Sequence, residues 1–235
     1  MAELPPTRFD GATGSPTTCA VATQLVLPKD STVSAMPCVF VGTVIAWTRM
    51  DGTRRCVLVV KPDGRIVRPV LEKELGVWDE VHNLQPGMAY QFTVSDQRLD
   101  PVRPHTEDVA VSDFLAIGQL PFQMPEVVSD LPSQFIDHFY VNEPTDLEKS
   151  VFVLDVKGFR VFEASYGKYK ATWDHNPRRF PYTVSSVALR SLGGAPARDG
   201  WVVLGMARFW DNEGKYSPRR SFLMVVGGHF DGKFY

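Results

Sequence analysis

Residues 39–60, with the sequence VFVGTVIAWTRMDGTRRCVLVV, carry a clear local signal of β structure. The first ten residues, up to Thr48, are rich in β-branched and small side chains, which favour an extended strand. Asp51-Gly52 is a strong signal for a tight hairpin turn, and Arg54 to Val60 supplies the returning strand. The stretch therefore predicts a β-hairpin.

The next segments continue the β pattern. The turn at residues 61–64, with the sequence KPDG, leads into a strand over 65–70 whose side chains alternate between two faces. Apolar residues spaced by three or four predict a short helix over 71–84, and 89–94 is a further predicted strand. Prolines interrupt residues 99–111, which argues against a helix there. Together these elements predict a first small β-barrel over residues 36–117.

The remainder divides into a linker and a second β-rich part. Residues 118–149 are rich in proline and acidic residues and predict a linker, with one short helix from Leu131 to Tyr140. Residues 150–235 hold short apolar segments separated by Gly, Pro, Asn and Asp, a spacing typical of a sandwich or barrel. Residues 1–35, rich in Pro, Thr, Ala and Ser, predict a flexible N-terminal extension. We therefore expect a mainly β protein with two small β-barrels in tandem.

Composition is that of a folded protein. The chain has 235 residues, of which 44% are apolar and 22% charged, and this excludes wholesale disorder. No apolar run approaches the roughly 18–20 residues that cross a bilayer, and residues 1–10 lack the basic and apolar parts of a secretory signal. Cys19, Cys38 and Cys56 have no Cys-x-x-Cys spacing, so we expect reduced thiols rather than a zinc site. We expect a cytoplasmic protein with no membrane contact.

Charge is distributed unevenly along the chain. Residues 1–150 hold 12 Lys and Arg against 20 Asp and Glu, whereas residues 151–235 hold 13 against 7. The basic second half could meet a polyanion such as a nucleic acid. The two halves could also attract one another across an interface, and the two interpretations can hold together.

Several short motifs follow one another in a distinctive order. In the first half they are Ala46-Trp47-Thr48-Arg49, Arg54-Arg55-Cys56, Ile66-Val67-Arg68-Pro69-Val70 and Pro101-Val102-Arg103-Pro104-His105. In the second half they are the segments 159–162, 168–171, 179–185 and 221–226. This order resembles the dual OB-containing domain family of bacteria, from which Thr48, Pro181 and residues 1–35 depart. The resemblance implies two OB-like barrels and a role in bacterial conflict or mobile-element defence, with nucleic-acid sensing; it supplies no catalytic residues.

The strongest candidate site is the basic–aromatic hairpin at residues 166–182. Cations in this stretch would contact phosphates, while exposed aromatic rings would stack on bases. The predicted nucleic-acid-binding residues here are Lys168, Lys170, Trp173, Arg178, Arg179, Phe180 and Tyr182. On a strand, however, Tyr169, Ala171 and Trp173 share one face. If that face belongs to the core, the cations remain available to a ligand while these rings do not, and this alternative stays open.

A second group of cations lies in the first half. The predicted nucleic-acid contacts of this group are Arg49, Arg54 and Arg55, and the predicted anion clamp consists of Arg68, Arg103 and His105. Arg68 shares its face of the strand with Ile66 and Val70, and a buried arginine needs a partner. An ion pair is therefore the favoured interpretation of Arg68, and the candidate acids are Glu72, Asp100 and Asp108.

No enzyme signature is present. The five histidines are scattered, and no metal-binding, nucleotide-binding or nucleophile-elbow motif occurs. We therefore expect no metal, no cofactor and no catalytic residue. The leading hypothesis is a non-catalytic module that binds nucleic acid, mainly single-stranded, with DNA and RNA not distinguished. The alternatives are an adaptor that docks on a protein partner of the same defence system, and an unrecognised enzyme or small-ligand sensor.

Overall fold

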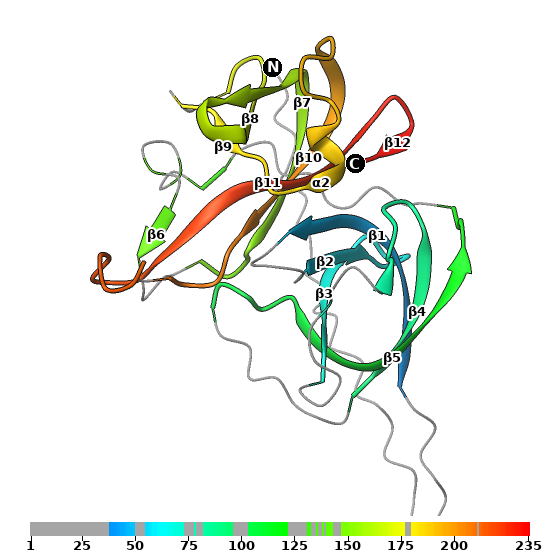
Figure 1. The fold of residues 1–235 in the computed structure, drawn as a ribbon. Coiled ribbons are helices and arrows are strands. Elements are labelled where there is room, and N and C mark those ends of the chain that lie inside the picture. Colours follow the sequence, from blue (N-terminus) through cyan, green and yellow to red (C-terminus); the bar gives the residue numbers. More distant parts are fainter. Residues whose placement is uncertain are drawn as a thin grey trace, which may run out of the picture. The chain divides into compact units, whose positions relative to one another are not determined.

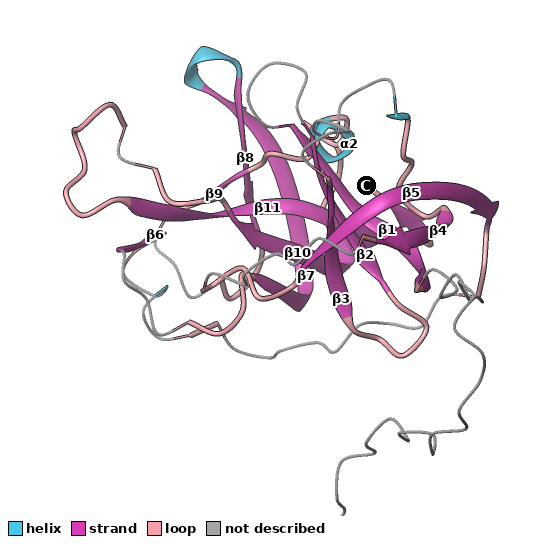
Figure 2. Ribbon diagram, turned by 90° about the horizontal axis from the view of Figure 1, so that it is seen from below, coloured by secondary structure: helices cyan, strands magenta, loops and turns pink. Residues whose placement is uncertain are grey.

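Two β-sheets make up most of the described part of the molecule (Figure 1). The computed structural model describes residues 38–49, 55–72, 78, 82–95, 103–121, 131–132, 135, 138, 140–142, 147–176, 180–210 and 212–235. Within these residues, helix is confined to short segments between strands (Figure 2). The prediction of a mainly β protein is confirmed.

The first sheet closes on itself as a five-stranded barrel. Its strands are β1 (Val39–Arg49), β2 (Arg55–Val60), β3 (Ile66–Leu71), β4 (Ala89–Val94) and β5 (Asp108–Gly118). They are hydrogen-bonded in the order β1-β2-β3-β5-β4, and β4 returns to β1. All neighbours are antiparallel except β3 and β5, which run parallel over four residue pairs from Arg68–Asp108 to Leu71–Val111. This is the arrangement of an OB-like barrel.

Alternation along the strands builds the core of the first barrel. Val57 and Val59 on β2 face the interior together with Phe92 on β4, and all three are fully buried. Trp78 joins this core with 3% of its surface exposed. Its Nε1 donates a 2.7 Å hydrogen bond to the carbonyl of Pro69, so the indole buries its ring while its polar end is satisfied.

The second sheet carries the remaining strands. They are β6 (Tyr140–Asn142), β7 (Val151–Ala164), β8 (Lys168–Thr172), β9 (Tyr182–Thr183), β10 (Arg198–Met206), β11 (Arg220–Phe230) and β12 (Lys233–Phe234). Their order is β12-β11-β10-β7-β8-β9, and β6 pairs with β11. A parallel bridge from Val184 to Val225 brings the chain after β9 back against β11, so the sheet curls. A 3₁₀ turn (Ser165–Gly167) follows β7, and the short helix α2 (Val187–Arg190) follows β9.

Both sheets share one connectivity. In each, the first strand pairs with the second and the fourth, the fourth pairs with the fifth, and the chain at the third strand runs parallel to the fifth. In the second sheet these roles fall to β7, β8, β9, β10 and β11. The prediction of two OB-like barrels in tandem is confirmed, the first closed and the second a curled half-barrel.

Gly158 allows β7 to pair with two different strands, β10 and β8. Residues 151–159 of β7 pair with β10, and residues 160–164 pair with β8. At the change-over, Gly158 adopts a φ of +65°, in the left-handed region that glycine tolerates. A Cβ at this position would lie 2.3 Å from the Asp174 carboxylate. β7 is therefore one continuous strand with an internal bulge.

The two barrels share a third apolar cluster, which we call the seam. Its buried residues are Ile45, Ala46, Leu58 and Val60 of the first barrel and Val151, Val153, Trp201, Val203 and Val226 of the second. On β2 the seam residues alternate with the core residues, so the seam covers the outer side of that strand. Gly227 permits close approach of the two barrels, because a Cβ on it would lie 2.4 Å from the Ile45 carbonyl oxygen. Residues 37–235 accordingly form one compact unit.

The largest difference from expectation is β5, which the sequence did not predict. It begins at Asp108, within the proline-interrupted region, and closes the first barrel. Its alternation is weak, since Ala110 and Val111 are both buried while Leu115 and Ile117 are exposed. The helices expected over 71–84 and 131–140 and the extension over 1–35 fall largely outside the described residues, and the domain boundaries stay predictions. No helix in the described part of the chain has the length and apolar character needed to span a membrane.

Candidate functional site

The outer side of β8 carries two cations of the predicted hairpin. Ala171 and Trp173 point into the core of the second barrel. The alternation of the strand therefore turns Lys168 and Lys170 outward. Lys168 is exposed, whereas Lys170 lies across the neighbouring strand and its Nζ donates a 2.8 Å hydrogen bond to Thr183 Oγ1 on β9.

The second half of β7 adds two residues that the sequence analysis missed. In the register of the sheet, Arg160 lies opposite Thr172 and Phe162 lies opposite Lys170. Phe162 is 38% exposed and the Arg160 side chain 52%. The alternation in 159–164 was a sufficient signal, because Val161 between them is buried. We call Arg160, Phe162, Lys168 and Lys170 the basic face.

One acidic residue moderates the basic face. Asp174 Oδ1 lies 3.4 Å from Arg160 Nη1, and both side chains are about half exposed. Ion pairs in contact with water are weak, because solvent screens both charges. Arg160 can therefore exchange this carboxylate for another anion.

The aromatic residues of the hairpin divide between core and surface. Trp173 and Tyr182 stack on one another with ring centroids 4.9 Å apart, and their exposed fractions are 7% and 1%. Neither ring offers a free face to a ligand in this structure. Phe180, by contrast, is 62% exposed. Among the side chains that the structure describes near the hairpin, those of Phe180 and Phe162 have rings that a base could reach.

The other predicted nucleic-acid contacts are buried or outside the described residues. Arg55 is 6% exposed, and its backbone N–H donates a 2.7 Å hydrogen bond to the carbonyl of Trp78. Its side chain is therefore not presented at the surface as predicted. Arg54, Arg178, Arg179 and the side chain of Arg49 lie outside the described residues.

One residue of the predicted anion clamp, Arg68, takes part in an ion cluster between the barrels. Arg68 is 7% exposed, and its Nε donates a hydrogen bond to Asp108 Oδ1, one of the three acids that the sequence had offered as partners. Arg208, which follows β10 of the second barrel, places its Nη2 3.5 Å from Asp108 Oδ2. One carboxylate thus joins cations from both barrels.

His105 and Cys56 border this cluster. Burial lowers the pKa of His105 to about 4, and the positive charge of Arg68 acts in the same direction. Burial also raises the pKa of the Cys56 thiol. Arg103 is exposed, and its Nη2 lies 3.6 Å from Glu148 Oε1. The geometry favours an ion pair network that joins the barrels, which we call the ion junction, over an anion clamp. The reason is that the Asp108 carboxylate already neutralises the charge of Arg68.

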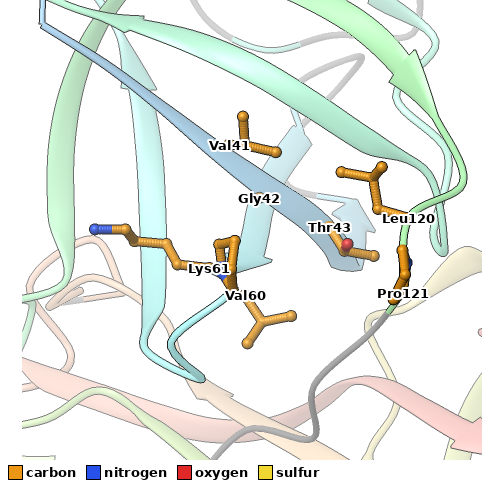
Figure 3. A pocket seen from close by; sticks show the side chains of 8 residues that line it. Val41, Gly42, Thr43, Val60, Lys61, Leu120 and Pro121 are labelled. Carbon is orange, nitrogen blue, oxygen red and sulfur yellow. The ribbon is translucent and has the colours of Figure 1, made fainter.

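Two observations on the described residues bear on small-molecule binding. Among them, no group of three or more His, Cys, Asp or Glu could hold a metal ion. A hollow beside β1 has a volume of about 20 Å³, and its lining includes Thr43, Val60, Leu120 and Pro121 (Figure 3). That is room for one water molecule and too little for a nucleotide.

No family model, curated protein or solved structure matches this chain. The resemblance to the dual OB-containing domain family therefore rests on the motifs alone.

Proposed function

We propose that this protein is a non-catalytic module that binds single-stranded nucleic acid through the basic face of its second barrel. The observation that carries the proposal is the row in which Phe162 of β7 stands opposite Lys170 of β8, with Arg160 and Lys168 on either side. Cations that follow a phosphate backbone and rings that stack on bases are the two parts of a sequence-tolerant single-strand site.

The place of the basic face in the fold supports the proposal. β8 and β9 take the second and third positions in the connectivity of the second barrel, and OB-like barrels bind oligonucleotides on the face of those strands. In the first barrel Leu58 and Val60 occupy the matching face and are buried in the seam. The second barrel is therefore the proposed binding unit, in keeping with its excess of 13 Lys and Arg over 7 Asp and Glu.

The biological setting that we propose is a bacterial defence or mobile-element system in the cytoplasm. This part of the proposal is supported by the motif resemblance alone.

The test is salt-dependent binding of labelled single-stranded DNA and RNA to the wild-type chain and to a Lys168→Glu/Lys170→Glu variant. The wild type should bind at about 50 mM salt, and its affinity should fall as salt rises, with a slope of about 0.7 per phosphate contact. The double variant should bind about tenfold more weakly or worse, with a slope smaller by about 1.4, because two contacts are lost.

The matched control is Lys149→Glu/Lys233→Glu, which changes the net charge equally at two exposed sites, before β7 and on β12. This variant should keep most of the wild-type affinity. Failure of the wild type to bind either DNA or RNA at about 50 mM salt, where phosphate contacts are strongest, overturns the proposal.

An adaptor role is the second candidate, favoured by exposed apolar residues on the first barrel. Val39, Leu115, Ile117 and Leu120 are 47%, 65%, 43% and 39% exposed. Exposed apolar groups gathered on one surface mark protein–protein interaction sites. For an adaptor, Leu115→Lys/Ile117→Lys should abolish a stable complex on co-purification and leave nucleic-acid affinity unchanged. Lys168→Glu/Lys170→Glu should then leave that complex intact.

A further inference from the structure

An exposed aromatic cluster lies at the connection between β10 and β11. Trp210 is 51% exposed and packs edge-on against Tyr216, with ring centroids 6.0 Å apart, and against Phe222 at 6.4 Å. The guanidinium of Arg220 lies over the ring of Tyr140 at 4.2 Å and over that of Tyr216 at 4.5 Å. We call these five residues the aromatic shelf.

Backbone hydrogen bonds hold the aromatic shelf in place. The N–H of Trp210 donates to the carbonyl of Arg220 at 2.8 Å, and the N–H of Arg220 donates back to the carbonyl of Trp210 at 2.9 Å. Pairing of β6 with β11 sets Tyr140 opposite Phe222. The ring of Trp210 is therefore presented in a defined position, which lowers the ordering cost of binding to it.

The stretch of chain that carries most of the aromatic shelf has a small excess of positive charge. Residues 207–220 carry four Lys and Arg against two acids, Asp211 and Glu213. Arg208 and Lys215 are both exposed. A base stacked on Trp210 would bring its phosphates among these cations. A proline-rich peptide could also pack on an exposed tryptophan, but it would gain nothing from them.

We propose that Trp210 is a second stacking site for a base of single-stranded nucleic acid, separate from the basic face. The inference rests on the proposed function, which it deepens by adding a contact on another part of the second barrel. The Arg220 guanidinium lies over the rings of Tyr140 and Tyr216, beside Trp210.

The exposure of Trp210 makes a direct test feasible. The other tryptophans are shielded: Trp78, Trp173 and Trp201 are 3%, 7% and 2% exposed, and Trp47 is half-buried. Titration of the wild-type chain with oligothymidylate should quench the fluorescence of Trp210, and this quenching should disappear in Trp210→Leu. Anisotropy of a labelled oligothymidylate gives the affinity independently. It should be about 5- to 150-fold weaker in Trp210→Leu, the equivalent of one stacked base.

Leu115→Ala removes an exposed apolar side chain from the first barrel, and it serves as the control that should keep the wild-type affinity. Equal affinity of wild type and Trp210→Leu, with no quenching, would overturn the inference and leave the proposed function standing. No anisotropy change with the wild type would overturn the proposed function, and the inference with it. Quenching by a proline-rich peptide and not by oligothymidylate would assign the aromatic shelf to a protein ligand and overturn the inference.

Discussion

The two barrels share a connectivity but use the outer side of their second strand in opposite ways. In the first barrel Leu58 and Val60 on β2 are 3% and 2% exposed, because the second barrel covers them. In the second barrel the matching strand β8 turns Lys168 and Lys170 outward. The parallel closure also differs, with four residue pairs in the first barrel and a single bridge in the second.

Strand order alone therefore does not determine which face of a barrel is open to a ligand. The same face serves as an internal interface where its residues are apolar and as an open surface where they are basic. Function therefore follows the outward residues of each barrel rather than the fold that carries them.

The largest effect is expected from removing the Asp108 carboxylate, which joins the barrels. Asp108→Ala leaves Arg68 buried without its counter-charge, so we expect the free energy of unfolding to fall by about 3–5 kcal/mol. Urea denaturation followed by tryptophan fluorescence measures the loss. Arg65→Ala is the control, because its side chain is 71% exposed in a surface pair with Asp63, and it should change stability little. Equal effects of the two variants would contradict the ion junction.

The pH dependence of stability should report on the same cluster. The pKa of His105 is about 4 in the folded state against an ordinary value of 6.5, so the fold favours the neutral ring. The neutral His105 ring makes its full contribution to the free energy of unfolding above about pH 6.5. This contribution, about 3 kcal/mol in total, is lost as the pH falls towards 4. His105→Asn should flatten this part of the profile, whereas His175→Asn, at an exposed site, should retain it. Superimposable profiles for wild type and His105→Asn would show that burial of this ring does not govern acid stability.

A substitution in the seam should lower the stability of the protein by a smaller amount and leave its affinity for oligonucleotides unchanged. Gly227→Ala would place a Cβ 2.4 Å from the Ile45 carbonyl oxygen, so the seam has to shift. We expect a loss of about 1–3 kcal/mol in the free energy of unfolding. Oligonucleotide affinity, measured by anisotropy on the folded variant, should stay at the wild-type level, because the basic face lies on β7 and β8 and the shelf residues of β11, Arg220 and Phe222, lie toward the other end of that strand. A parallel loss of affinity would mean that the first barrel contributes to binding.

Local signals in the sequence predicted much of the fold. The Asp51-Gly52 turn signal and its flanking residues predicted the hairpin now seen as Val39–Arg49 and Arg55–Val60. β5 was missed because it is covered unevenly along its length, so its apolar residues follow no single period. Its pairing with β3 is a contact between distant segments, which no local pattern specifies.

The candidate site could be predicted from the sequence as far as it depends on the alternation of side chains along a strand. Alternation placed Lys168 and Lys170 on one side of a strand and Trp173 on the other. It did not show which of the two sides faces the core. That depends on the curl of the whole second sheet. The partner of Arg68 could be narrowed to three acids, and only the parallel register of β3 and β5 selects Asp108.

The seam also bears on how the chain is synthesised. Leu58 and Val60 leave the ribosome early, while Trp201 and Val226, which help to cover them, lie far along the chain. At about 5–20 residues per second, the apolar face of β2 waits on the order of ten seconds for its cover. During that interval we expect the nascent first barrel to expose this apolar face to chaperones and, where they are scarce, to be prone to aggregation.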